Sequence, residues 1–267
     1  MAENKYINLD KFLVERQEQG YLSFTFEELR SRFDLSEESL LQSIFRYKAK
    51  KQVAQIRKGF YAIITPDYSK QGMLPPYLFI DDLMKSLNKP YYIALLSAAA
   101  LHGAAHQQPM EYFVVAQTPA PRSIRSQKIK LTFLSKSKWE EDAIIQKTSK
   151  AGYMNVSSPE LTALDLLFYA DKISLNSAVT VIQELVQEMK LASLVKTVKK
   201  YPHTAVIQRL GYILDKVLGE EKMAESLSKI LSERSVFTVL LSIKKEKKGS
   251  INERWKIIEN IRIESDL

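Results

Sequence analysis

The chain has 267 residues, enough for two domains with sizeable cores, and it contains no cysteine, which excludes disulfides, thiol catalysis and cysteine-ligated zinc. The formal net charge of +8 and the sequence pI of about 9.3 suit an acidic partner such as nucleic acid, but they also fit a basic protein that is simply soluble. The first residues lack the apolar core of a signal peptide, and the longest nearly apolar run, Tyr91 to Leu101, is too short to cross a bilayer, so the sequence predicts a soluble, cytoplasmic protein.

The first elements are helical. Residues 6–19 predict a helix that Gly20 ends. Thr25 followed by Glu28 fits a capping box, in which each side chain bonds a free backbone N–H of the other residue. This pattern predicts a short helix that ends near Asp34.

A second helix start follows at Ser36, a good N-cap residue with two acidic residues after it. On a helical wheel the next residues separate into two faces. The predicted inward face carries Leu40, Leu41, Ile44 and Phe45. The predicted outward face carries Ser39, Gln42, Ser43, Arg46 and Lys50.

A hairpin pattern comes next. Val53–Ile56 and Phe60–Ile64 are β-prone runs, joined by Arg57-Lys58-Gly59, where glycine permits a positive φ. Helix, turn, helix and hairpin is the order of a winged helix-turn-helix, which we assign to residues 1–65. From residue 44 to 60 there are six Lys or Arg and no acid, a bias that favours phosphate attraction.

These residue types predict an interface with double-stranded DNA. Arg46 can reach O6 and N7 of guanine in a major groove, and Gln42 can pair with N6 and N7 of adenine. The predicted contacts to base edges are Ser39, Gln42, Ser43 and Arg46; those to phosphates are Lys50, Lys51, Arg57 and Lys58. Two alternatives stay open: a solvated helix face without a partner, and a module that binds protein.

Turn-forming residues at 66–76 predict a linker before a larger C-terminal domain, 77–267. That domain is predicted to be mixed α/β over 77–157, mostly helical over 158–232 and closed by strands within 236–260. The fold class is α+β and helix-rich. Predicted helices are 80–87, 91–102, 161–169, 178–189, 206–218 and 223–231; predicted strands are 111–116, 129–134, 153–156, 236–243 and 255–258.

Catalytic patterns are weak. His102 and His106 are four residues apart, but the residues between them lack the glutamate of a metalloprotease motif. Two Ser-x-x-Lys matches, at Ser135 and Ser193, are too short to be informative, and no Gly-rich phosphate loop is present. The sequence therefore predicts no catalytic residue, no metal and no cofactor. A nuclease or transferase that a winged helix directs to nucleic acid remains the alternative.

Two further segments are basic. Residues 121–138 hold six Lys or Arg and no acid, and residues 190–209 hold Lys196, Lys199, Lys200 and Arg209 without an acid. These segments could extend a surface that binds nucleic acid or a toxin. They could equally be solvent-exposed loops and helix faces whose charge only keeps the protein soluble, and both interpretations stay open.

Several short segments together resemble one family. They are Tyr91-Tyr92 with Ser97-Ala98-Ala99 and Leu101-His102-Gly103; Ser158-Pro159-Glu160 running to Leu166; Gln208-Arg209-Leu210-Gly211-Tyr212; and Asn252-Glu-Arg-Trp255 ahead of Asn260. With the N-terminal winged-helix pattern, their order and spacing are similar to those of AbiEi-family antitoxins and transcriptional regulators of type IV toxin–antitoxin systems.

The resemblance implies a protein with two roles. The winged helix would bind inverted repeats in operator DNA and repress transcription, as a homodimer or by cooperative binding of two copies. The C-terminal domain would counter a nucleotidyltransferase-fold toxin without a stable complex, in a system of the kind associated with phage resistance. The resemblance carries no toxin-countering residue over to this chain. Because the catalytic patterns are weak, we expect the protein not to be an enzyme.

Overall fold

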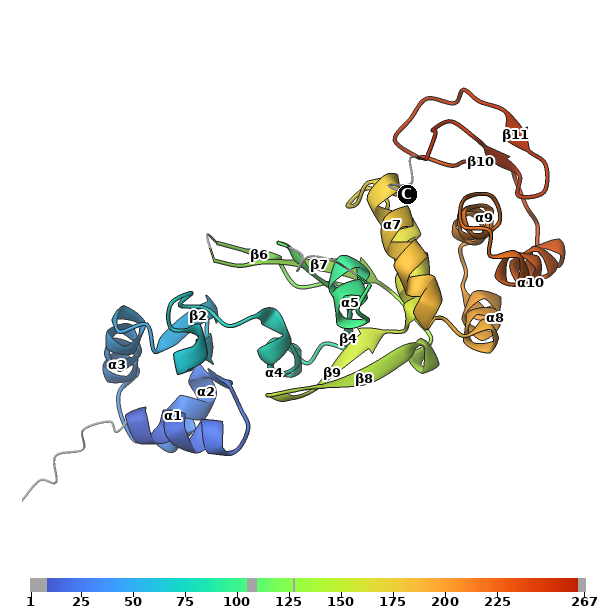
Figure 1. Cartoon of the computed structure of the whole chain (residues 1–267). Helices are drawn as coiled ribbons and strands as arrows, with labels where there is room; N and C mark the ends of the chain where they lie inside the picture. Colours follow the sequence, from blue (N-terminus) through green and yellow to red (C-terminus); the bar gives the residue numbers. More distant parts are fainter. Residues whose placement is uncertain (1–8, 105–109, 127, 264–267) are drawn as a thin grey trace, which may run out of the picture. The chain divides into compact units, whose positions relative to one another are not determined.

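The computed structural model describes residues 9–104, 110–126 and 128–263, and those residues form ten α-helices and three sheets (Figure 1). This confirms the predicted α+β class. The chain divides into two compact units. The first comprises Met1–Tyr92, Val115–Ser135 and Gln146–Asn155; the second comprises Ile93–Val114, Lys136–Ile145 and Val156–Leu267.

The first unit begins with six elements in the order α1, β1, α2, α3, β2, β3. Their bounds are Leu9–Glu18, Ser23–Thr25, Phe26–Arg32, Glu37–Ala49, Val53–Arg57 and Phe60–Ile63. The three strands form an antiparallel sheet in the order β1-β3-β2, with Ser23 opposite Ala62 and Val53 opposite Ile63. The predicted helices and hairpin of this segment are therefore present.

Local sequence explains where these helices start. The backbone N–H of Glu28 donates to Thr25 Oγ1 at 3.1 Å, and the Thr25 N–H donates to Glu28 Oε2 at 2.7 Å, so the predicted capping box is confirmed. Ser36 Oγ accepts from the Ser39 N–H at 3.3 Å and caps α3. Gly59 takes a φ of +76° in the tight turn between β2 and β3.

An aromatic core holds these elements together. Phe24 on β1 meets the Phe12 ring edge-on at 5.4 Å and stacks on Tyr61 of β3 at 5.3 Å. Leu29 of α2 and Leu40 of α3 are fully buried in the same cluster. Burial of these side chains, at about 1.5–3 kcal/mol each, fixes the orientation of α3 against the sheet.

Between β3 and the large sheet, the first unit continues through two short 3₁₀ turns, Pro66–Tyr68 and Pro76–Leu78, into α4, Ile80–Ser86. Leu74 is buried in this stretch. Ser23 Oγ donates to Asp82 Oδ2 at 2.6 Å, which ties β1 to α4. Burial raises the pKa of Asp82, and the Ser23 hydroxyl opposes that rise.

The second sheet has six strands in the order β6-β7-β5-β4-β9-β8. Their bounds, in chain order from β4, are Tyr91–Ile93, Tyr112–Gln117, Ile124–Arg125, Lys130–Lys136, Ile144–Ser149 and Gly152–Ser157. β4 runs parallel to β9, and β6 runs antiparallel to β7. The strands predicted at 111–116, 129–134 and 153–156 are confirmed as β5, β7 and β9.

One prediction in this region is wrong. Residues 91–102 do not form a single helix, because Tyr91–Ile93 is the sheet strand β4 and helix α5 covers only Leu95–Leu101. Ile93 pairs with Val156 of β9, and Ser157 Oγ donates to the Ile93 carbonyl at 3.3 Å. The apolar run fits a buried strand as well as a helix, so its pairing partner decides the outcome.

Helices dominate the rest of the second unit. α6 packs against α5, α7, α8 and α9. α10 packs against α8 and α9 (Figure 1). The bounds of α6 to α10 are Pro159–Phe168, Leu175–Leu185, Leu191–Lys200, Thr204–Tyr212 and Glu221–Ser232. A π-helical turn, Ile213–Val217, extends α9. Ser158 Oγ accepts from the Leu161 N–H at 3.3 Å and caps α6.

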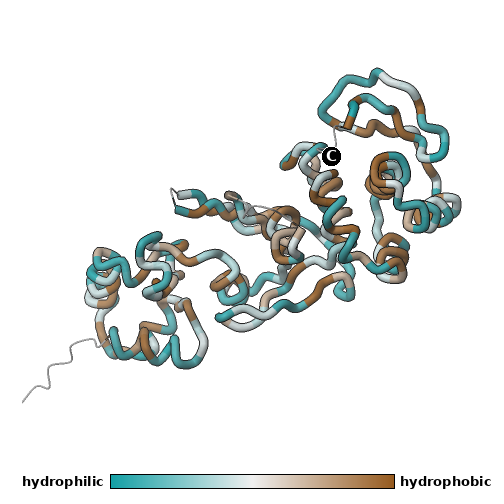
Figure 2. Tube along the Cα trace, in the orientation of Figure 1, coloured by the Kyte–Doolittle hydropathy of each residue, from teal (hydrophilic) through white to brown (hydrophobic). Residues whose placement is uncertain are grey.

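A small sheet of order β10-β12-β11 closes the unit, with bounds Val239–Leu240, Ile257–Ile258 and Ile251–Asn252. The strands predicted at 236–243 and 255–258 are present only in part. The Trp255 ring lies so close to Gly211 of α9 that a Cβ there would fall 1.9 Å from Cζ3. Figure 2 shows hydrophobic residues on α9 and hydrophilic residues along the loop after β10. No described helix is long and apolar enough to span a membrane.

Candidate nucleic-acid interface

The orientation of α3 differs from the predicted one. Leu40 and Ile44 are buried as expected, but Phe45 is 70% exposed and Leu41 is 44% exposed, while Ser43 is only 2% exposed. The helical wheel defines relative angles only, and contacts with α2 and β2 turn the helix so that Leu40, Ser43 and Ile44 face inward. The predicted inward position of Leu41 and Phe45 and the predicted outward position of Ser43 are therefore wrong.

Although it is buried, Ser43 contacts Arg46, a residue of the candidate interface. Arg46 Nη2 donates to Ser43 Oγ at 3.0 Å, and the Arg46 side chain itself is exposed. A hydroxyl below an arginine restricts the rotamers of that arginine and lowers the entropy lost when it binds. Ser43 is thus a residue that positions Arg46.

The other predicted residues of α3 lie at the surface. Gln42 is exposed next to Phe45, and Ser39 is exposed at the first turn, where its hydroxyl hydrogen-bonds Ser36 Oγ at 2.9 Å. Lys50 follows the end of α3 and is exposed, with its Nζ 5.5 Å from the centre of the Tyr47 ring. The exposed face of α3 therefore combines polar side chains with two apolar ones.

The hairpin carries the remaining predicted cations. Lys58 is exposed in the turn and Arg57 is half-buried at the end of β2, where a β-bulge interrupts the pairing with β3. Lys51 is exposed and has a φ of +58° in the tight connection to β2. Lys48 Nζ donates to Gln55 Oε1 at 2.8 Å, which connects α3 to the hairpin.

The basic segment 121–138 separates into two parts. In the first unit, Arg122, Arg125 and Lys130 are exposed on and around the β6–β7 hairpin, and Lys128 Nζ donates to the Gly72 carbonyl at 3.2 Å. In the second unit, Lys136 is buried. The exposed part lies at the surface of the first unit, whereas Lys136 lies inside the second.

Two lysines of the segment 190–209 form ion pairs with acidic residues that precede β8. Lys196 Nζ lies 2.5 Å from Asp142 Oδ2, and Lys200 Nζ lies 3.1 Å from Glu140 Oε2. Both lysines lower the pKa of Asp142 by hydrogen bonding to it. Arg209 has a structural role, because its Nε donates a hydrogen bond to the Leu240 carbonyl at 2.9 Å. The acids before β8 thus offset much of this positive charge.

The sequence reasoning missed a buried charged cluster. Lys136 Nζ lies 2.6 Å from Asp165 Oδ1, with the two side chains 7% and 0% exposed, and the Tyr201 hydroxyl donates to the same oxygen at 3.3 Å. Burial raises the pKa of Tyr201 well above its usual value, and the Asp165 carboxylate adds to the rise. A visible sign was the lone aspartate within the apolar run of α6.

Among the residues that the structure describes, no group of three His, Cys, Asp or Glu side chains could hold a metal ion. The ring of His102 contacts the Ser157 carbonyl through Nε2 at 2.7 Å, which satisfies it inside the fold. His106, which the sequence places four residues after His102, lies outside the described residues.

Comparison with known proteins assigns the middle part of the chain. Residues 92–216, from β4 to the π-helical turn, match the family model of the AbiEi antitoxin C-terminal domain. The chain carries an AbiEi antitoxin C-terminal domain. The predicted family resemblance is thereby confirmed. The Lys136–Asp165 pair and α6 lie inside this antitoxin domain, whereas α1 to β3 precede it.

Solved structures give the fold. The RV2827C protein from Mycobacterium tuberculosis is similar in structure over 93% of this chain and 89% of its own, with a TM-score of 0.65 and 14% identity. An antigenic nucleotidyltransferase-like protein from Paracoccidioides brasiliensis covers 58% of this chain and 85% of its own at 11% identity, and its TM-score of 0.30 is too low to support an argument. Among curated proteins, none matches the chain.

Proposed function

We propose that this AbiEi-family protein is a DNA-binding autorepressor whose first 65 residues form a winged helix-turn-helix. The supporting observation is the order α1-β1-α2-α3-β2-β3 with the sheet order β1-β3-β2. In this arrangement an exposed face of α3 lies beside the β2–β3 hairpin, which carries Arg57 at the end of β2 and Lys58 in the turn. In a winged helix the second helix of the pair enters the major groove and the hairpin contacts the flanking backbone.

In this proposal α3 reads bases. Gln42 and Arg46 contact adenine and guanine edges, Ser39 contacts the start of the site, and Ser43 holds Arg46. The exposed Phe45 adds an apolar contact, and the thymine methyl group is the apolar feature of the major groove. The phosphates are held by the cations after α3 and in the hairpin: Lys50, Lys51, Arg57 and Lys58.

An operator with inverted repeats requires two copies of the chain, bound as a homodimer or cooperatively. The two half-sites then lie on one side of the duplex, about 10–10.5 base pairs or a multiple apart. Residues 66–76 serve as the linker to the C-terminal domain, 77–267, in this arrangement.

The antitoxin domain has the second role. We propose that it counters a nucleotidyltransferase-fold toxin in the cytoplasm, without catalysis and without a stable complex, as part of a type IV system that confers phage resistance. The family match over residues 92–216 supports this role. Co-expression of the chain with the neighbouring toxin should restore growth, and mixing the purified proteins should give no co-eluting complex.

The DNA-binding half is tested by a gel shift with the DNA just upstream of the gene, over a series of salt concentrations. Arg46→Ala should cost about 1–3 kcal/mol and relax the preference at one base pair. Lys58→Ala should weaken binding to every sequence and reduce the salt slope by about 1. Lys70→Ala, which removes an exposed lysine of the first unit outside both sets, is the matched control.

Three results would contradict the proposal: no preference for the upstream DNA over scrambled DNA, equal behaviour of the Arg46 and Lys58 variants, or an equal loss with Lys70→Ala. Divalent-metal-dependent cleavage of nucleic acid by the purified chain would instead favour an enzyme that the winged helix directs to its substrate.

A further inference from the structure

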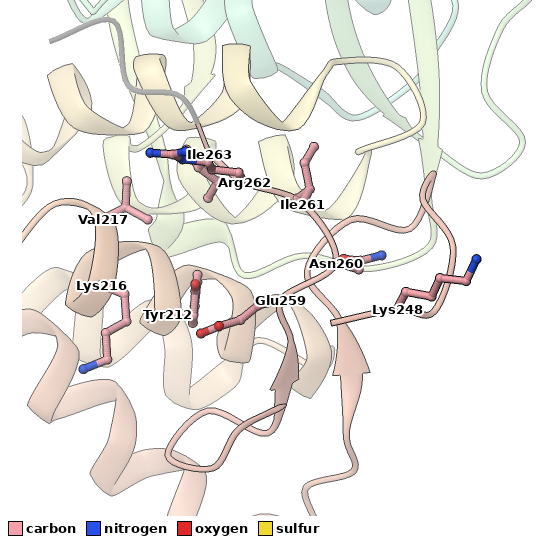
Figure 3. A pocket seen from close by; sticks show the side chains of 9 residues that line it. All are labelled: Tyr212, Lys216, Val217, Lys248, Glu259, Asn260, Ile261, Arg262 and Ile263. Carbon is pink, nitrogen blue, oxygen red and sulfur yellow. The ribbon is translucent and has the colours of Figure 1, made fainter. Parts of the chain in front are cut away.

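A polar pocket lies in the C-terminal part of the second unit. Its volume is about 650 Å³, and three segments line it: the end of α9 with its π-helical turn, the loop between β10 and β11, and the strand end after β12 (Figure 3). The lining residues are Tyr212, Lys216, Val217, Lys248, Glu259, Asn260, Ile261, Arg262 and Ile263. This volume lies within the range of small-molecule sites, about 300–1,000 Å³.

Hydrogen bonds hold the wall of the pocket in place. Glu259 accepts from Ser250 Oγ at 2.8 Å and from Asn252 Nδ2 at 3.4 Å. Its carboxylate faces the Tyr212 side chain (Figure 3), and hydrogen bonds from Ser250 and, to a smaller extent, from the Tyr212 hydroxyl lower the pKa of Glu259. The Asn260 amide bonds both the N–H and the carbonyl of Ser242, each at 2.9 Å. The site is therefore formed before any ligand arrives.

Close backbone packing adds to this rigidity. Gly249 has a φ of +151°, and a Cβ at this residue would lie 2.4 Å from the Glu259 carbonyl oxygen. Only glycine allows the loop that carries Lys248 to approach the strand end after β12 so closely. The backbone that carries Lys248 is thus held beside the pocket.

Three cations surround this pocket. Lys216, Lys248 and Arg262 are all exposed, and each comes from a different segment. The one carboxylate among the lining residues, Glu259, is occupied by the hydrogen bonds of the wall. The lining therefore presents an excess of positive charge, and its three cations come from separate parts of the chain.

The ion pairs of these cations are weak. Lys248 Nζ lies 2.6 Å from Glu246 Oε2, but the two side chains are 84% and 77% exposed, so water competes with the pair. Lys216 Nζ lies 3.6 Å from Asp215 Oδ2, an oxygen that also accepts from Trp255 Nε1 at 2.8 Å. Within the described residues no ion pair involves Arg262. A ligand anion can therefore draw on all three charges.

We propose that this pocket binds a phosphate-bearing ligand, either a nucleotide-like small anion or the backbone of a nucleic-acid strand. The guanidinium group and the two ammonium groups that three segments contribute to the lining can serve the several oxygens and multiple charges of phosphate groups. The volume of about 650 Å³ leaves room for a ligand larger than a single phosphate. No residue of this site belongs to the proposed winged helix, so it is a second, independent anion site.

Binding to the full-length chain is measured with two probes: inorganic pyrophosphate by calorimetry and a fluorescein-labelled single-stranded hexanucleotide by anisotropy. The hexanucleotide is tested in an Arg46→Ala/Lys58→Ala background, so that DNA binding by the first unit and failure of its proposed function do not affect the result. The test variant is Lys248→Ala/Arg262→Ala. The control is Lys222→Ala/Lys229→Ala, which removes two exposed lysines of α10 that are not among the lining residues.

The test variant should weaken binding at least tenfold, and for the strand it should reduce the slope of log K against log salt by about 1.4. The control should match the parent chain, and equal melting temperatures should show that both variants fold. Arg262→Lys keeps the charge and should lose only part of the affinity. Binding of both probes indicates shared phosphate chemistry, binding of the strand alone indicates nucleic acid, and binding of pyrophosphate alone indicates a small anion. The proposal is overturned if neither probe binds below about 1 mM at 0.1 M salt, or if test and control variants behave alike.

Discussion

Lys136→Met should destabilise the antitoxin domain severely. In the native protein Lys136 and Asp165 are 2.6 Å apart and almost completely buried, so the substitution leaves the Asp165 carboxylate without its cation. Breaking a buried pair from one side costs about 3–5 kcal/mol. The Tyr201 hydroxyl, 3.3 Å from the same oxygen, still donates one hydrogen bond and places the loss toward the lower end of that range.

The assay is urea and thermal unfolding, followed by circular dichroism. A loss of 3–5 kcal/mol corresponds to a fall in Tm of about 6–20 °C for a domain of this size. The double variant Lys136→Met/Asp165→Leu removes both charges and should recover most of the loss, since an apolar pair of similar volume is often neutral or better. Lys229→Met breaks the exposed pair with Glu225, 3.8 Å long, and should change stability by less than about 0.5 kcal/mol.

Two results would refute this reasoning. If Lys136→Met costs less than about 1 kcal/mol, the carboxylate is hydrated or neutral in the native protein and the pair is not buried as described. If the double variant is as unstable as the single one, the loss comes from packing against the rings of Phe168 and Tyr201, which lie 5.6 and 5.1 Å from Lys136 Nζ.

Three further predictions follow from local geometry. Gly211→Ala places a methyl group inside the Trp255 ring and should destabilise the second unit by about 1–3 kcal/mol, measured by urea unfolding; an unchanged midpoint would contradict the packing. Thr25→Ala removes the capping box of α2 and should cost about 1 kcal/mol, and Thr25→Ser, which keeps the hydroxyl, should cost much less. Glu259→Gln should flatten the acid sensitivity of Tm: hydrogen bonds from Ser250 lower the pKa of Glu259, so its contribution is complete above about pH 4.5 and is lost as the pH falls through the folded-state value. Parallel Tm–pH curves for wild type and Glu259→Gln between pH 5 and 3 would argue against that assignment.

The sequence by itself determined the local features of this protein. The Thr25–Glu28 box, the Ser36 and Ser158 caps and the Gly59 turn depend on residues within a few positions of each other, so the helix starts and the hairpin could be predicted. The segments that resemble the family could also be recognised from the sequence, because their order and spacing are read along the chain and require no knowledge of tertiary contacts. The family match over residues 92–216 agrees with that resemblance.

Features that depend on contacts between residues far apart in the sequence could be determined only from the tertiary structure. The rotation of α3, which buries Ser43 and exposes Phe45, follows from packing against α2 and β2. Tyr91–Ile93 became a strand because β9 pairs with it, although its sequence also fits a helix. Lys136, one of six cations in a basic segment, is buried because Asp165, 29 residues later, meets it inside the domain. Composition reports how many charges a chain has, but only folding decides which of them face water and which face each other.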